Sequence, residues 1–243
     1  MELRDRTAIV TGGAVRLGRA LALRLAAERV HVCLHYHGSE DAAEDALERI
    51  RQLGVRGTAV QADFSRPEPA ARKVLEHAGS ALGPVDILVN SAAVFGPDSL
   101  AGLEEDDWDR HQNVNLKAPV FLSQAFARQI GPQQCGQIVN IADWRACRPV
   151  PGHLAYTVAK AGLITATRLL ARELAPRIRV NAIAPGAILP PPGEPDAYLD
   201  RLAERIPLRR TGGPDDVADA LVYLLRSDFT TGEVLHVTGG EEL

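Results

Sequence analysis

The sequence predicts one α/β domain over residues 1–243, built on a doubly wound, mostly parallel sheet. Seven short runs rich in β-branched residues alternate with longer segments of helical apolar period, and no linker-like change of composition interrupts them. Hydrophobic residues make up 46% of the 243 positions, enough to bury a sizeable core. Helices that connect parallel strands by right-handed crossovers cover both faces of such a sheet.

The strands are expected, in chain order, at residues 7–10, 30–34, 57–61, 86–89, 137–141, 179–183 and 234–237. Segments 18–28 and 41–53 are rich in Ala, Leu, Arg and Glu and predict crossover helices, and a third helix is expected over 156–174. Residues 185–195 carry five of the 16 prolines and predict neither helix nor strand. We expect a substrate loop over about 187–205 in a Rossmann-like fold.

Composition narrows the classes of partner. A net charge of −4 gives no basic field for nucleic acid or an anionic membrane, so a small molecule is the expected partner. Charges near the start of the chain, in MELRDRTAIVTGG, replace the apolar run of a signal peptide, and no stretch has the length of a membrane span, so a cytoplasmic protein is expected. Cys33, Cys135 and Cys147 lack paired spacing and predict reduced thiols.

The turn after the first strand, TGGAVRLG over residues 11–18, favours a dinucleotide site. Its glycines let the backbone approach a pyrophosphate, and the helix that follows offers free N–H groups. A Gly-Gly turn of this kind is also common in other α/β proteins, so the neighbouring features decide.

The second strand ends without the Asp or Glu that binds the ribose of NAD. Residues 31–39 hold no carboxylate, whereas Arg16, His37 and Ser39 offer donors to the 2′-phosphate of NADP. The alternative interpretation is a solvated turn. His31, His35 and His37 alternate along the strand without a carboxylate cluster, so no metal site is predicted.

Tyr156 and Lys160 are one helical turn apart and project from the same face. An ammonium group beside a phenol lowers the phenol pKa, which favours proton transfer near neutral pH. These two residues are therefore the candidate catalytic pair.

Five motifs occur in an order typical of one family, and over essentially the whole chain the sequence resembles the short-chain dehydrogenase/reductases. The motifs are the glycine turn, Asn90-Ser91-Ala92, Asn115, the YxxxK spacing and Pro185-Gly186. The resemblance implies that Tyr156 donates a proton, that Lys160 holds the nicotinamide ribose, and that Asn115 supports a water relay. It also implies a homotetramer, with interfaces on the helices around Asn115 and 155–175 and on segment 231–243. The cofactor residues that it implies are Gly12, Arg16, Leu17, Gly18, His35, Tyr36, His37, Ser39, Asp63, Phe64, Asn90, Ser91, Ala92, Lys160, Pro185 and Gly186.

Two departures from the common family pattern are informative. Arg16 stands at the middle glycine of the turn, and Asp143 stands at the family serine, 13 residues before Tyr156 (156 − 143 = 13). A carboxylate only accepts hydrogen bonds and repels a developing alkoxide, so it suits a substrate with ring N–H donors better than a ketone.

In both departures, and in the run HYHGS at 35–39, the sequence is similar to the pteridine reductases. These enzymes reduce dihydropterins and, in some members, biopterin or folate. That similarity implies an NADPH-dependent pteridine reductase in which Asp143, Tyr156, Lys160 and Asn115 are catalytic. Arg16, Phe95, Asp143 and Tyr156 would bind the substrate, with Phe95 stacking on the pterin ring; a core position is the alternative for Phe95.

Several alternatives stay open. Gly38 replaces an arginine that pteridine reductases often have near the 2′-phosphate, which leaves the strictness for NADPH over NADH open. Trp144 and Arg145 follow Asp143 and either line the pocket or lie on the surface. The other candidate functions are a carbonyl reductase acting on a 3-oxoacyl thioester or a sugar ketone, and a catalytically silent NADP-binding regulator.

Overall fold

The computed structural model describes residues 1–191, 193 and 197–243. In these ranges, seven parallel strands form one sheet in the order β3-β2-β1-β4-β5-β6-β7. The strands are β1 (Thr7–Val10), β2 (His31–Tyr36), β3 (Gly57–Gln61), β4 (Ile87–Asn90), β5 (Gly136–Ile141), β6 (Ile178–Pro185) and β7 (Val234–Val237). All seven predicted strands are confirmed with small shifts at their ends. One boundary needs correction: the sequence predicts that the irregular stretch begins at Pro185, but Pro185 is the last residue of β6.

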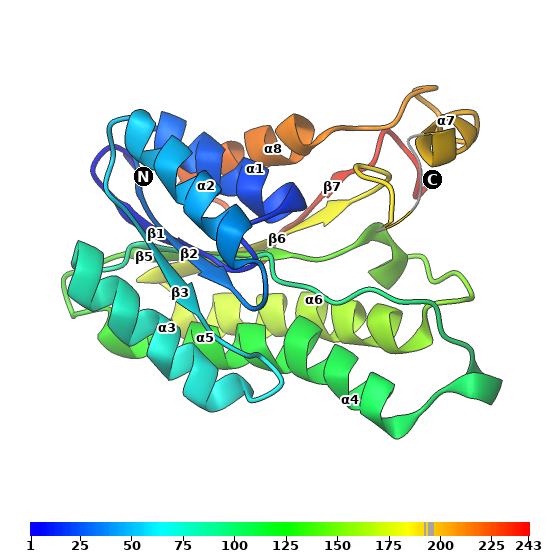
Figure 1. Ribbon diagram of the computed structural model, residues 1–243, viewed down its shortest axis with the longest axis horizontal. Helices are drawn as coiled ribbons and strands as arrows, with labels where there is room; N and C mark the ends of the chain where they lie inside the picture. Colours follow the sequence, from blue (N-terminus) through cyan, green and yellow to red (C-terminus); the bar gives the residue numbers. More distant parts are fainter. Residues whose placement is uncertain (192, 194–196) are drawn as a thin grey trace.

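Helices cover both faces of the sheet (Figure 1). On one face lie α1 (Arg16–Ala27), α2 (Glu40–Gln52) and α8 (Pro214–Arg226), and on the other α3 (Pro67–Leu82), α5 (Ala118–Gln129) and α6 (Leu154–Leu174). The short α4 (Glu105–Gln112) runs into α5 through a π-helical segment, Asn113–Lys117. The short helix α7 (Ala197–Ala203) lies beyond the end of the sheet, near the segment that follows β7.

The core forms as two apolar layers separated by the sheet. Every residue of β1, β4 and β5 is buried, as expected for parallel strands covered on both faces. Leu21 of α1 and Leu221 of α8 pack in one layer, while Leu122 and Phe126 of α5 pack in the other. In the described part of the chain, no helix has the length and apolar character needed to cross a membrane.

The sheet order reverses direction between β1 and β4. From β1 the chain moves outward to β2 and β3, then returns to the other side of β1 with β4. Ligands of doubly wound sheets bind at such a reversal, beyond the carboxyl ends of the strands. Thr11 joins the two strand ends here, because its Oγ1 accepts from the backbone nitrogens of Ser91 (2.9 Å) and Ala92 (3.0 Å).

Candidate active site

The turn between β1 and α1 leaves its backbone open to a ligand. Gly12 has φ +64°, and a Cβ added there would lie 2.9 Å from the Cα of Ala92. A Cβ on Gly18 would lie 2.1 Å from the carbonyl oxygen of Gly12. Only glycine fits either position: Gly12 lets the loops after β1 and β4 approach each other, and Gly18 lets α1 start close against the turn.

Arg16 is left-handed, with φ +52°, a conformation in which glycine is far more common. The family glycine that Arg16 replaces would adopt this conformation without strain. Its guanidinium does not reach toward the end of β2, where the sequence analysis expected it near a phosphate. It donates instead to the carbonyl of Pro190, tying the glycine turn to the loop after β6.

Two adjoining cavities open at the strand ends. The inner cavity, of about 370 Å³, is lined by Arg16, Phe95, Asp143, Tyr156 and Lys160. The predicted cofactor residues that line the same cavity are Gly12, Leu17, Gly18, Ser91, Ala92, Pro185 and Gly186. The outer cavity has a volume of about 580 Å³. The other predicted cofactor residues line it, apart from Asn90: they are His35, Tyr36, His37, Ser39, Asp63 and Phe64. Gly12 and Ala92 border both cavities, so one extended ligand can occupy the pair.

His35 supports the glycine turn from below. Its Nδ1 accepts from the backbone N–H of Gly12 at 3.2 Å, and its Nε2 lies 3.1 Å from the carbonyl oxygen of Ala62. Its ring stacks on Phe64 with centroids 4.0 Å apart. Burial lowers the pKa of His35 to about 4, so the ring is neutral and Nε2 carries the proton.

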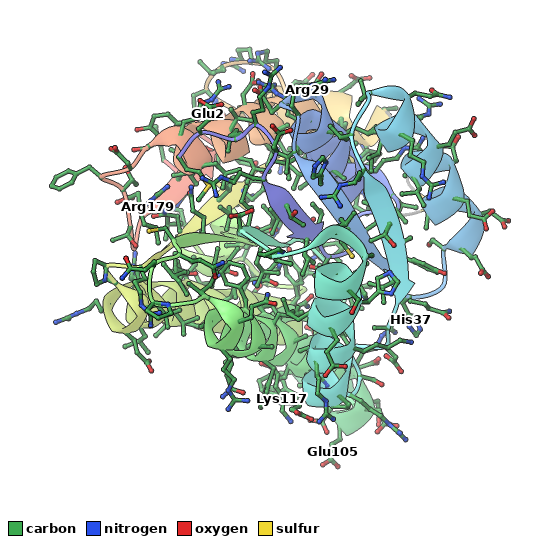
Figure 2. The ribbon with its side chains drawn as sticks, turned by 90° about the vertical axis from the view of Figure 1, so that its left-hand side faces the viewer. Glu2, Arg29, His37, Glu105, Lys117 and Arg179 are labelled. Carbon is green, nitrogen blue, oxygen red and sulfur yellow. The ribbon has the colours of Figure 1, made fainter. Side chains whose placement is uncertain are left out.

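The end of β2 carries no carboxylate, and its polar groups are exposed. Gln61 Nε2 donates to the carbonyl of His37 at 2.8 Å, and Figure 2 labels His37 beside the tip of β3. Asp63 lies across the outer cavity, where hydrogen bonds from Ser65 lower the pKa of its carboxyl group. Its Oδ1 is 3.9 Å from His37 Nδ1.

Tyr156 and Asp143 form the polar centre of the inner cavity. Tyr156 lies in the first turn of α6, and its hydroxyl donates to Asp143 Oδ2 at 2.9 Å. Asp143 follows β5 and caps a 3₁₀ turn (Trp144–Ala146), because its Oδ1 accepts from the backbone N–H of Arg145 at 2.8 Å. Arg145 Nη1 lies 3.5 Å from the same oxygen. Both carboxylate oxygens of Asp143 are therefore engaged.

The pKa of Tyr156 is raised well above its usual value, which corrects the expectation that Lys160 lowers it. Burial is the largest cause, followed by the charge of Asp143 and the hydrogen bond to it. Lys160 Nζ donates to the carbonyl of Ile141 at 2.6 Å and lies 5.7 Å from the centroid of the Tyr156 ring. Tyr156 consequently keeps its proton at neutral pH, as a proton donor requires.

Phe95 lies at the rim of the inner cavity with 37% of its surface exposed, and not in the core. Its ring stacks on His153 (centroids 4.3 Å apart) and meets the edge of Tyr156 (4.9 Å, interplanar angle 86°). His153 is held in turn through Nδ1, 2.9 Å from the carbonyl oxygen of Gly96. These contacts fix the orientation of a partly exposed aromatic ring beside the ring of Tyr156.

Two asparagines that the sequence predicts as site residues, Asn115 and Asn90, are buried and line neither cavity. Asn115 is fully buried in the π-helical segment, where its Oδ1 accepts from Val94 N and its Nδ2 donates to Val94 O, both at 2.9 Å. It thus clamps the segment that leads to Phe95. The side chain of Asn90 is also buried and donates to Asn140 Oδ1 at 2.8 Å, so it supports the loop and lines neither cavity.

Comparisons with known proteins establish the family. A family model described as enoyl-(acyl carrier protein) reductase matches residues 13–242. A short-chain type dehydrogenase/reductase from Picea abies is 32% identical, over 98% of this chain and 93% of its own length. The chain belongs to the short-chain dehydrogenase/reductase family. It is an oxidoreductase of that family.

Other members of the short-chain dehydrogenase/reductase family are similar over nearly the full length. The 3-oxoacyl-[acyl-carrier-protein] reductase of Staphylococcus epidermidis is 35% identical, over 97% of this chain and 98% of the relative. The crystal structure of FolM alternative dihydrofolate reductase 1 from Brucella suis, in complex with NADP, is 36% identical. It superposes with a TM-score of 0.94 and covers 100% of this chain and 96% of that one.

Glu241, a carboxylate that lines the inner cavity from the segment after β7, was not predicted from the sequence. The only sequence signal is its place directly after Gly239-Gly240, which allows a sharp turn. Of the two residues left open, Arg145 lines the cavity and Trp144 is buried.

The predicted substrate loop, 187–205, contains α7. Tyr198 and Leu202 of this helix line the inner cavity together with Leu189 of the preceding segment. Residues 192 and 194–196 of the loop lie outside the described residues.

No group of three or more His, Cys, Asp or Glu side chains is placed to hold a metal ion within the described ranges. Cys33 is buried, and burial raises the pKa of its thiol to about 12. Cys135 and Cys147 are exposed free thiols.

We expect the titration of Lys160 to set the alkaline limb of the pH dependence of kcat/KM. Burial lowers its pKa to about 8, so the ammonium loses its charge as the pH rises through that value, whereas Tyr156 stays protonated. We expect kcat/KM for NADPH, which reports the free enzyme, to fall above about pH 8. In Lys160→Arg the guanidinium stays charged, and the limb should flatten. A wild-type profile that stays level to pH 10 would contradict this assignment, since an ordinary lysine titrates at about that pH.

Proposed function

We propose that the chain is an NADPH-dependent reductase that transfers hydride to a pteridine, a dihydropterin or dihydrofolate-like ring. The observation that carries the proposal is the Asp143 carboxylate, which takes the hydrogen bond of the Tyr156 hydroxyl at 2.9 Å at the wall of the inner cavity. A carboxylate there cannot donate to a ketone oxygen, but it can orient the Tyr156 hydroxyl as the proton donor to a ring nitrogen.

NADP(H) is the cofactor, and the cavities fit it. The cradle at Gly12 and Gly18, at the start of α1, suits a pyrophosphate. The end of β2 has no carboxylate to repel a 2′-phosphate and offers His37 and Ser39 to it. The solved relative from Brucella suis is in complex with NADP. When bound, NADPH supplies the hydride.

The remaining cofactor contacts follow from the cavity linings. Lys160, which lines the inner cavity, would hold the nicotinamide ribose. Ser91, Ala92, Pro185 and Gly186 would border the nicotinamide, while Asp63 and Phe64 would border the adenosine.

Tyr156 supplies the proton that accompanies the hydride. Reduction of a ring C=N bond places the hydride on carbon and a proton on nitrogen, and the Tyr156 hydroxyl donates that proton. Asp143 Oδ2 orients the hydroxyl, and the charge of Asp143 raises the tyrosine pKa. Solvent completes the relay, and Asn115 supports it by fixing the backbone at Val94.

Phe95 and Arg16 orient the substrate. Phe95 presents a partly exposed ring beside Tyr156, which suits stacking on a flat heterocycle. Arg16 lines the same cavity and holds the loop after β6 through Pro190. The Brucella suis relative, named an alternative dihydrofolate reductase, supports a substrate of this class.

A carbonyl reductase is the second candidate. The Staphylococcus epidermidis relative, named a 3-oxoacyl-[acyl-carrier-protein] reductase, is 35% identical and favours a 3-oxoacyl thioester. That reaction requires Asp143 to act in place of a hydroxyl donor. The catalytically silent regulator is opposed by the intact set of Tyr156, Lys160 and Asn115.

Steady-state turnover separates these functions. NADPH consumption is followed with dihydrobiopterin or dihydromonapterin and, in parallel, with an acetoacetyl thioester, using NADH as the cofactor control. We expect turnover with the pterin and NADPH. Turnover with the thioester alone would make the chain a ketone reductase, and cofactor binding without any turnover would favour the regulator.

We further propose a cytoplasmic homotetramer. Leu154, Val158 and Leu169 share one face of α6 and stay exposed, with Leu169 at 62%, which leaves an apolar face for a second copy. Light scattering of the purified enzyme measures this state, and a monomer would contradict the proposal.

A further inference from the structure

A second carboxylate, Glu241, enters the inner cavity from the segment that follows β7. This segment turns back through Gly239 (φ +64°) and Gly240 (φ +91°), and the turn is closed by Gly240 N donating to Thr238 Oγ1 at 3.1 Å. Figure 1 shows this end of the chain beside α7, at the same end of the sheet as the loop after β6. The turn therefore carries Glu241 to the substrate end of the cavity.

The loop after β6 is built to receive this carboxylate. Glu241 Oε2 accepts from the backbone N–H of Ala187 at 2.9 Å. A Cβ added to Gly186 would lie 2.5 Å from the same oxygen, so the glycine leaves the space that the carboxylate fills. Glu241 is thus held in a fixed position against the cavity wall, and is not a free side chain at the surface.

Glu241 keeps acceptor capacity that Asp143 has used. Within residues 1–191, 193 and 197–243, Oε1 of Glu241 has no hydrogen bond, and Oε2 has one. Asp143, in contrast, engages one oxygen with Tyr156 and the other with Arg145. Among these two cavity carboxylates, Glu241 is the one available to accept from a ligand.

The surroundings of Glu241 suit a ligand with paired donors. Partial burial is the largest cause and raises the pKa of Glu241 above its usual value. The hydrogen bond from Ala187 N–H and the charge of Arg145 oppose this rise, and the charge of Asp143 adds to it. An incoming N–H pair would replace the water lost on burial with charge-assisted hydrogen bonds. The pyrimidinone ring of a pterin has such a pair, a ring N–H beside an exocyclic amino group, and an acyl thioester chain has none at its reacting end.

We propose that Glu241 is a specificity-determining residue that accepts hydrogen bonds from the amino-pyrimidinone edge of the substrate. This inference rests on the proposed pteridine substrate and adds a recognition group to it. The two carboxylates then have separate tasks: Asp143 positions the proton of Tyr156, and Glu241 selects the ring and holds its far edge. Phe95 contacts the face of the ring.

The test is equilibrium binding to the enzyme saturated with NADP⁺, measured with two matched rings. Pterin carries an amino group beside a ring N–H, and lumazine carries a carbonyl oxygen in place of that amino group. We expect the wild type to prefer pterin. In Glu241→Gln, which keeps the size of the side chain and an oxygen for Ala187 N–H, we expect pterin affinity to fall by about tenfold to a hundredfold. Lumazine affinity should hold or rise, because an amide can donate to its carbonyl oxygen.

Glu242→Gln is the matched control, because it makes the same substitution one residue further along and outside the inner cavity. It should leave both affinities within about twofold, and both variants should keep the NADP⁺ affinity and Tm of the wild type. If Glu241→Gln weakens both rings equally, or neither, the assignment of Glu241 is wrong although the pteridine function stands. If the wild type binds neither ring, the pteridine function and this inference both fail.

Discussion

Tyr156→Phe is expected to lower turnover by about 10²–10⁴-fold, the usual contribution of a positioned general acid. The substitution removes only the hydroxyl that donates to Asp143 Oδ2, and it keeps the ring that meets Phe95 edge-on. NADPH affinity should therefore stay within about twofold, while the rate of the chemical step in a single turnover collapses.

Stability provides a second signature of this variant. Without the hydroxyl, Asp143 Oδ2 loses its donor in a largely buried site, which costs about 1–3 kcal/mol of unfolding free energy. The control is Tyr223→Phe, the same chemical change at an exposed position on α8. Single-turnover kinetics with both variants decide the point, and a Tyr156→Phe enzyme with near-normal turnover would remove this residue from proton transfer.

Asp143→Ser is expected to change which substrate is reduced. Pterin turnover should fall by about 10²-fold or more, because the hydroxyl of Tyr156 loses the carboxylate that orients it. A serine hydroxyl is able to donate to a carbonyl oxygen, so turnover of an acetoacetyl thioester should hold or rise. NADPH binding should change little, because Asp143 lies at the substrate side of the inner cavity.

The measurement is the ratio of kcat/KM for pterin to kcat/KM for thioester, with the Kd of NADPH measured alongside. Asp143→Asn serves as the companion variant, because it keeps the size of the side chain and removes its charge. Equal loss of turnover and of NADPH binding, or no loss of either, would exclude Asp143 from the mechanism.

The fold was predictable because its strands carry strong local signals. The centres of β1, β4 and β5 consist mainly of Ala, Ile, Leu and Val, and these strands are buried at every position, as parallel strands covered on both faces require. Longer segments of helical period separate the strands along the chain. Helical spacing predicts that Tyr156 and Lys160 share one face of a helix, which is a property of a short segment that periodicity reports well. Asp143 is assigned from the resemblance to the family, whose serine it replaces 13 residues before the tyrosine.

The features that were missed depend on contacts between distant segments. Glu241 meets Ala187 only because the turn after β7 folds back over β6. The raised pKa of Tyr156 depends on burial and on the charge and hydrogen bond of Asp143, none of which helical spacing reveals. The π-helical segment had a local signal: Pro119 has no N–H to donate to the carbonyl of Asn115, four residues earlier.

Transfer of isotope from cofactor to substrate tests the central claim most directly. The enzyme is given NADPH carrying deuterium at the transferable position, together with a dihydropterin, and the reduced pterin is analysed by mass spectrometry. The pteridine reductase function predicts one deuterium in each pterin product, and in Tyr156→Phe a rate reduced by the same factor as turnover. A pterin that stays unlabelled, while the same preparation transfers deuterium to an acetoacetyl thioester, would contradict it.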